Sequence, residues 1–317
     1  MVRIGEIMNT DLDIIIPCYN AKETLFYTLS SISIQRGVSG FKVYLVNDKS
    51  DYDYQEEVEF FSKFFPIEEI KLKTNQGPGA ARREGIKNSN SKYIMFIDSD
   101  DSLYDCFAIK KLYYNGLGHD LCISNFILER DGVSVVKEHN LVWLHGKIYR
   151  REFLEKNNIN FNDTRANEDN GFNRLILLLE PDYVYLDEVT YVYKENSNSI
   201  TRSNNRSYKI HGLEGFIYNM KWAMEEGLKR GCNPHICRFF ANNVLVSLYY
   251  DYLYYINDKD VNNILIYAKD IIPYYGDISN EILNEYMDAK DKMYLEENKK
   301  VDKTISFDEF LKKVSKS

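Results

Sequence analysis

The chain of 317 residues is poor in cysteine, proline and tryptophan, with 5, 6 and 2 copies respectively. The cysteines are odd in number and scattered, and no two of them form a Cys-x-x-Cys pair. This spacing indicates neither a disulfide framework nor a cysteine-based zinc site. We therefore expect the chain to work in a reducing compartment inside the cell.

Long hydrophobic runs are also missing. No stretch of about 18 apolar residues occurs, so the sequence predicts no membrane span. Residues 1–11 mix charged and apolar residues and do not contain the apolar segment of a signal peptide. We expect a cytoplasmic protein, and peripheral attachment to the inner face of the membrane stays open.

Positive charge is in deficit, because 40 Lys and Arg stand against 48 Asp and Glu, for a net charge of −8. Proteins that bind a phosphate backbone usually carry a basic face. This balance argues against nucleic acid as the main partner and leaves a local basic patch open. The chain is rich in Tyr (26) and Phe (17), which fits either an AT-rich genome or a carbohydrate-binding surface.

The first hundred residues alternate between strand and helix patterns. Short apolar or β-branched runs predict strands at 13–16 (ended by Pro17), 41–46, 67–73 and 93–97. Helical spacing of apolar residues predicts helices at 21–34, 54–65 and 79–88. This order predicts an α/β fold with an open, mostly parallel sheet flanked by helices.

The rest of the chain divides near residue 204. Residues 121–129 and 133–137 predict a hairpin around Gly132, followed by a helix at 170–179 and a strand at 183–193. After residue 205 the pattern is helical, most clearly at 238–256. We therefore predict an α/β domain over 1–204 and an α-helical C-terminal region over 205–317.

Polar residues follow each of the four predicted strands, and in open parallel sheets such strand ends share one edge, where ligands bind. The acidic cluster that contains Asp98, Asp100 and Asp101 is the most telling of these groups. Carboxylates at such an edge suit Mg²⁺ or Mn²⁺. The alternative is an acidic turn that caps the next helix.

Four short motifs stand in one order along the chain: Pro17-Cys18-Tyr19-Asn20, Asp48-Lys49-Ser50, Asn75-Gln76-Gly77-Pro78-Gly79-Ala80-Ala81-Arg82 and Asp98-Ser99-Asp100-Asp101. Each motif is weak alone, but the ordered set is specific. Residues 12–202 resemble the family 2 glycosyltransferases, which have a Rossmann-like GT-A fold and invert the anomeric centre.

The resemblance implies a site for a UDP-sugar within residues 12–101, although a thymine or guanine nucleotide is not excluded. Pro17, Tyr19 and Asp48 would line the base pocket, and Lys49 departs from the residues that many relatives carry there. The loop with Asn75 and Gly77 would pass the ribose and diphosphate. Arg82 would meet phosphate oxygens at the start of its helix.

The same resemblance implies that Asp100 binds Mn²⁺ or Mg²⁺ directly. Asp98 would touch the ribose or a metal-bound water, so both are implied metal-site residues, and Asp101 would contact sugar hydroxyls. The metal would stabilise the departing nucleoside diphosphate.

The acceptor side and the catalytic base are expected within residues 120–204. Glu168-Asp169 resembles the Glu-Asp motif of the family, in which the aspartate takes the proton from the acceptor hydroxyl. Asp169 is therefore the candidate general base. The alternative is a helix start where acidic residues are favoured by the helix dipole.

Two further segments match the family less sharply. Residues 143–151 resemble an Asn-Lys-Leu-Tyr-Arg run in which His145 replaces the usual Asn. His145 would contact the donor sugar or its phosphate, or would be a structural histidine. Residues 193–202 resemble a closing segment in which Arg202 covers the diphosphate; the alternative is a linker to the helical region.

Together these features predict a metal-dependent, inverting glycosyltransferase of the hexosyl-transferring type, acting on a glycan or other hydroxyl acceptor in cell-surface polysaccharide synthesis. Glycosylation of a modified DNA base and an inactive sugar-nucleotide-binding module stay open. A nucleotidyltransferase is disfavoured because its Gly-rich first loop is missing. An aromatic helical stripe is either core or a homo-oligomer contact: Leu245, Leu248, Tyr249, Tyr252 and Tyr255.

Overall fold

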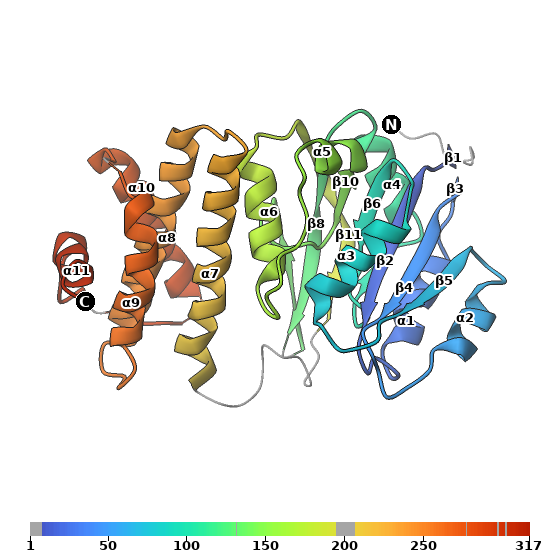
Figure 1. Cartoon of the computed structure of the whole chain (residues 1–317), viewed down its shortest axis with the longest axis horizontal. Coiled ribbons are helices and arrows are strands. Elements are labelled where there is room, and N and C mark those ends of the chain that lie inside the picture. Colours follow the sequence, from blue (N-terminus) through green and yellow to red (C-terminus); the bar gives the residue numbers. More distant parts are fainter. Residues whose placement is uncertain (1–7, 131, 195–206, 277, 297, 302) are drawn as a thin grey trace. The chain divides into compact units, whose positions relative to one another are not determined.

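The computed structural model describes residues 8–130, 132–194, 207–276, 278–296, 298–301 and 303–317 (Figure 1). The chain divides into two compact units, Met1–Ser199 and Ile200–Ser317. The predicted boundary at residue 204 lies in segment 195–206, outside the described residues.

The first unit is built on a mixed sheet with the strand order β5-β4-β2-β6-β10-β8-β11-β7. Four strands run parallel as predicted: β2 (Leu12–Cys18), β4 (Lys42–Asn47), β5 (Ile67–Lys71) and β6 (Tyr93–Phe96). The sheet continues through β10 (Lys147–Arg150), β8 (Leu121–Arg130), β11 (Tyr183–Tyr193) and β7 (Ser102–Leu103). The predicted hairpin is confirmed, since β9 (Val133–Lys137) pairs antiparallel with β8. β1 (Met8–Asn9) and β3 (Val38–Ser39) form a separate small sheet.

Helices cover both faces of the large sheet because residues along each strand alternate between the faces. Ile14 and Ile16 share one apolar cluster with residues of α1 (Leu25–Ser33), α2 (Gln55–Phe61) and α4 (Ala108–Gly116). Ile15 faces the other way, against Gly85 of α3 (Pro78–Asn88). On that same side Phe96 packs against Phe172 of α6 (Glu168–Leu178), with ring centroids 5.9 Å apart. A short helix, α5 (Arg151–Lys156), follows β10.

The first strand is longer than predicted, because β2 continues through Pro17 to Cys18. The Ile15 carbonyl accepts the Ile97 N–H on the β6 side, and the Cys18 carbonyl accepts the Asp48 N–H on the β4 side. Backbone groups alternate between the two sides, so Pro17 faces β6 beyond that strand's last pair, Ile15 with Phe96. A proline is tolerated there because no ladder bond needs its missing N–H.

The sequence analysis did not predict β10, which enters the sheet antiparallel between β6 and β8. Its four residues, Lys147–Arg150, are too few for a clear periodic pattern. The insertion matters for the site because it brings the segment before Lys147 to the end of β6.

The second unit is α-helical, as predicted. Its helices are α7 (Ser207–Lys229), α8 (Pro234–Tyr254), α9 (Asn262–Ile271), α10 (Asn280–Glu296) and α11 (Phe307–Val314), with a 3₁₀ turn at Ile272–Tyr274. The aromatic stripe of α8 packs inside this unit: Tyr249 is 2% exposed and its hydroxyl donates to the Ile305 carbonyl at 2.8 Å. Among the described residues, the helices are too short or too polar to cross a bilayer.

Candidate functional site

Polar residues gather where β2, β4 and β6 end at one edge of the sheet. Tyr19 follows β2 and is 53% exposed, whereas Asp48 follows β4 and is 2% exposed. The acidic turn at 98–101 follows β6. Pro17 itself is buried within β2. The exposed ring of Tyr19 and the carboxylate of Asp48 therefore stand at neighbouring strand ends, and their role in a base pocket stays a prediction.

Asp48 organises the loop that follows β5. Its two carboxylate oxygens accept the N–H groups of Gln76 at 2.8 Å and Gly77 at 2.7 Å, and the Asn75 side chain donates to its carbonyl at 3.2 Å. Gly77 has a φ of +92°, which only glycine adopts without strain. Burial raises the pKa of Asp48, although the two N–H groups and Arg165 oppose that rise. The spare lone pairs of this carboxylate remain able to accept from a ligand.

Arg165 was missed by the sequence analysis. Its guanidinium donates to Asn75 at 3.3 Å (to Oδ1) and 3.0 Å (to the carbonyl), and its side chain lies against Gly77. Arg165 and Asn75 are 90 positions apart in the sequence, and Arg165 lies in the irregular segment between α5 and α6. An exposed cation therefore lies at the rim of the predicted donor site.

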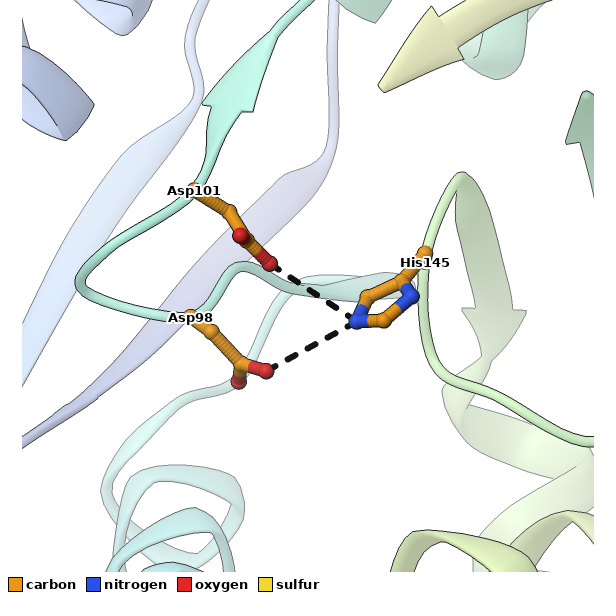
Figure 2. Close-up of side chains that lie close together, drawn as sticks. All are labelled: Asp98, Asp101 and His145. Atoms are coloured by element: carbon orange, nitrogen blue, oxygen red, sulfur yellow. Dashed lines mark ion pairs between the residues drawn. The ribbon is translucent and has the colours of Figure 1, made fainter. Parts of the chain in front are cut away.

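Two aspartates and a histidine form a tight cluster beside the end of β6 (Figure 2). His145 Nε2 lies 3.8 Å from Asp98 Oδ2 and 3.7 Å from Asp101 Oδ2. Asp101 also accepts the Tyr191 hydroxyl at 2.6 Å and the Lys194 N–H at 2.9 Å. The donor atoms of the cluster all lie within 4.8 Å of one another, a spacing that can hold a metal ion.

The two carboxylates of this cluster have opposite pKa shifts. Burial raises the pKa of Asp98, but the charge of Arg82 and the proximity of His145 outweigh burial and hold this pKa below its ordinary value. Burial and the charges of Asp98 and Asp100 raise the pKa of Asp101 well above its ordinary value. Such crowding of negative charge favours a bound cation. Oxygen donors of this kind fit Mg²⁺ or Mn²⁺.

Aromatic rings fix the orientation of His145. The rings of Tyr191 and Tyr193 stack on the imidazole, with centroids 5.0 Å and 4.8 Å away, and the edges of Phe126 and Trp143 complete the surroundings. His145 is 7% exposed, and burial lowers its pKa. Within the described part of the chain, its Nδ1 has no hydrogen-bond partner. Its Nε2 faces the carboxylates of Asp98 and Asp101.

Arg82 links Asp98, a member of the cluster with Asp101 and His145, to the start of α6. Its guanidinium donates to Asp98 Oδ1 and to Glu168 Oε1, each at 2.6 Å. The arginine is 4% exposed and packs over Phe161, with its guanidinium carbon 5.6 Å from the ring centroid. The resemblance implied a phosphate contact for Arg82. In the structure its two terminal nitrogens are bound to carboxylates.

Asp169 stands in the first turn of α6, after Asn167 in a left-handed conformation with φ of 59°. Its Oδ1 accepts the N–H of Asn170 at 2.8 Å. Withdrawal from solvent and the neighbouring Glu168 charge raise the pKa of Asp169 to about 7, although Arg82 opposes the rise. Asp169 remains partly exposed, whereas Glu168 is 5% exposed. A reachable carboxylate with a neutral-range pKa suits a general base.

Lys147 is a second residue that the sequence analysis did not single out. Its side chain is fully buried, and its ammonium donates to the Trp143 carbonyl. Burial lowers the pKa of Lys147 to about 7, while the charge of Asp169 acts in the opposite direction. A buried lysine near the candidate base is visible in the sequence only as one letter of the segment 143–151.

The other residues that the sequence analysis assigned to the site lie as follows. Asp100 lies in the acidic turn but outside the cluster of Asp98, Asp101 and His145. Asn75 and Gly77 form the predicted loop beside Asp48. Arg202 lies outside the described residues.

Comparison with known proteins finds similar sequences. The family model described as "Glycosyl transferase family 2" matches residues 13–166. A poly(ribitol-phosphate) β-N-acetylglucosaminyltransferase of Staphylococcus aureus, TarP, is 27% identical over 225 residues, covering 62% of this chain and 68% of that protein.

Solved structures show the same fold. The S. aureus TarS structure in complex with UDP-GlcNAc has a TM-score of 0.69 at 20% identity, covering 84% of this chain and 81% of that one. The Pyrobaculum calidifontis mannosyltransferase PcManGT, in complex with GDP-Man and Mn²⁺, has a TM-score of 0.56 at 12% identity, covering 90% and 81%. Residues 13–166 therefore match glycosyltransferase family 2, the curated relatives are named glycosyltransferases, and the chain has the GT-A fold.

Proposed function

We propose that this enzyme transfers a sugar from a UDP-sugar to an acceptor hydroxyl, with inversion and with Mn²⁺ or Mg²⁺ bound, in the synthesis of a cell-surface polysaccharide or related glycan. The observation that carries the proposal is the hydrogen-bonded chain from Asp98 through Arg82 to Glu168. Arg82 thereby links the acidic turn to Glu168, the chain neighbour of the candidate base Asp169, which supports a shared site.

The UDP-sugar donor binds to residues within the segment 12–101. The ring of Tyr19 stacks on the base, and Asp48 accepts a hydrogen bond from a base N–H, which favours uracil. The loop of Asn75 and Gly77, which Asp48 holds by two backbone bonds, follows the ribose and diphosphate. Arg165 adds positive charge at the rim. The complex of TarS with UDP-GlcNAc supports this donor class.

The acidic turn after β6 binds the donor's diphosphate through a divalent ion. Asp98 and Asp100 hold the divalent ion, and Asp101 contacts the sugar. When bound, such an ion neutralises charge on the leaving diphosphate. The complex of PcManGT with Mn²⁺ and the crowded carboxylates of this chain support the assignment. Arg202 would cover the diphosphate from the segment that follows β11.

The acceptor binds to residues within the segment 120–204, where Asp169 takes the proton from the acceptor hydroxyl. The acceptor oxygen attacks the anomeric carbon as the bond from that carbon to the phosphate oxygen breaks, and the nucleoside diphosphate leaves. A single base and direct attack invert the anomeric centre. The pKa of Asp169, raised to about 7, supports its role as proton acceptor. The helical region 205–317 would serve as a separate C-terminal module.

The test is a panel of nucleotide sugars with Mn²⁺, Mg²⁺ or EDTA, scored by nucleotide release and by thermal shift. We expect a UDP-sugar to stabilise the protein and to be turned over only with a divalent ion. Asp100→Ala should lose both effects, whereas Asp105→Ala, in the segment after β7, should keep them. A protein that ignores nucleotide sugars and divalent ions alike would refute the proposal.

A further inference from the structure

His145 is placed as a metal ligand rather than as a hydrogen-bond partner. Its Nε2 lies almost equally far from two carboxylate oxygens, 3.7 Å from Asp101 and 3.8 Å from Asp98. Both separations exceed a hydrogen bond. They fall within the range of about 3 to 4.4 Å that separates two ligand atoms sharing one cation at about 2.0–2.2 Å each.

The surroundings hold this nitrogen in place. Tyr191 and Tyr193 stack on the imidazole, and the Tyr191 hydroxyl also binds the Asp101 carboxylate at 2.6 Å. One tyrosine therefore orients both a nitrogen and an oxygen of the cluster. Arg82 occupies the other oxygen of Asp98 and leaves Oδ2 facing His145. Each side chain presents one atom to the same point.

A simple ion pair explains the arrangement less well. A histidine that paired directly with a carboxylate would sit within hydrogen-bond distance of one oxygen, as the ring of His119 does at 3.1 Å from Asp182. His145 instead stands back from both oxygens. The neutral ring has a lone pair for a cation, and the two carboxylates supply the opposing charge.

We propose that His145 Nε2 is a further ligand of the divalent ion that the proposed function gives to Asp98 and Asp100, and that this nitrogen makes the site prefer Mn²⁺ to Mg²⁺. Asp101 then turns its Oδ2 to the ion in place of the sugar contact. The inference rests on the proposed function, which supplies the metal. An imidazole nitrogen favours first-row transition ions, whereas Mg²⁺ prefers oxygen and keeps its waters.

Pulsed electron paramagnetic resonance of the full chain with Mn²⁺ and UDP tests the bond directly. We expect nitrogen modulation from a bound imidazole, and the modulation should change when the protein is made with histidine carrying heavy nitrogen. This measurement uses the wild-type chain and does not depend on how a variant folds. Bound Mn²⁺ without histidine nitrogen coupling would overturn the inference and leave the proposed function standing.

His145→Asn provides the second measurement, with His119→Asn as its control. His119 also faces a carboxylate, but it precedes β8 at the opposite edge of the sheet. His145→Asn should lose at least about tenfold in Mn²⁺ affinity, with a smaller change for Mg²⁺, while the control keeps both affinities. Circular dichroism in EDTA verifies that each variant is folded.

The outcomes separate the two proposals. A folded His145→Asn protein with unchanged Mn²⁺ affinity and unchanged preference refutes the role of His145 alone. A wild-type protein that binds no divalent ion in titration calorimetry refutes both this inference and the metal dependence of the proposed function.

Discussion

Arg82 of α3 and Glu168 of α6 form a buried ion pair, with 2.6 Å between Nη1 and Oε1 and with 5% and 6% of the two side chains exposed. The same guanidinium binds Asp98 at 2.6 Å. The acidic turn after β6 and the start of the helix that bears Asp169 are therefore held by one side chain. A change at Arg82 should disturb both at once.

Removal of Arg82 should destabilise the fold strongly. Arg82→Met leaves Glu168 buried without its cation and Asp98 without its partner, which typically costs about 3–5 kcal/mol. Denaturant unfolding gives the loss. Lys87→Met, on the exposed side of the same helix, removes a surface ion pair and should cost less than about 1 kcal/mol. Equal losses of stability in the two variants would mean that the buried ion pair contributes no more than the surface ion pair.

The role of Asp169 can be separated from donor binding. Asp169→Asn keeps the size and polarity of the side chain but cannot accept the proton, so kcat should fall about 10²–10⁴-fold while the donor still binds. Steady-state kinetics and donor titration measure the two effects. Asp163→Asn, at a side chain that is 92% exposed, is the matched control and should behave as wild type. Unchanged turnover in Asp169→Asn removes the base assignment.

The rate should depend on pH through the same carboxylate. Its pKa is raised to about 7, chiefly by withdrawal from solvent and next by Glu168. The base works when ionised, so kcat/KM should be constant above this pH and should fall about tenfold per unit below it. A pH profile of kcat/KM with the donor gives this limb. A profile that stays flat down to about pH 5 would contradict the prediction.

Lys147 should make stability depend on pH. Burial lowers the pKa of Lys147 from 10.5 to about 7, so the folded chain holds this proton less tightly than the unfolded chain. Between these values the unfolded chain binds more protons, and the free energy of unfolding rises with pH. Below about pH 7 both states are protonated and the burial penalty is complete.

Lys147→Met removes this dependence. The variant's advantage over wild type should be largest at and below about pH 7, and above that pH it should shrink by about 1.4 kcal/mol per unit up to about pH 9. Urea unfolding at several pH values measures the difference. Lys42→Met, at a partly exposed lysine paired with Glu68, should show no such trend over this range. If the difference in unfolding free energy between wild type and Lys147→Met does not change with pH, the pKa of Lys147 is not shifted by folding and the prediction is wrong.

Much of the fold follows from local sequence pattern. The runs around Ile14–Ile16 and Tyr93–Ile97 predict buried strands because apolar β-branched and aromatic residues suit a sheet covered on both sides. The polar residues that follow β4 and β6, Asp48 and Asp98, are predicted to share an edge because parallel strands end together. The structure confirms both expectations. The length of β2 and the presence of β10 were not predicted, since they depend on which strands become neighbours.

The sequence by itself determined most of the helix and strand pattern and the acidic edge, because each is encoded by residues close together along the chain. The candidate base, taken from a resemblance at Glu168-Asp169, stays a prediction. Only the tertiary structure decided that Arg82 faces Glu168 and Asp98, that Arg165 lies on Asn75 and that His145 points at two carboxylates. These contacts join residues 16 to 90 positions apart. Their formation depends on strand pairing and helix packing, which no local pattern specifies.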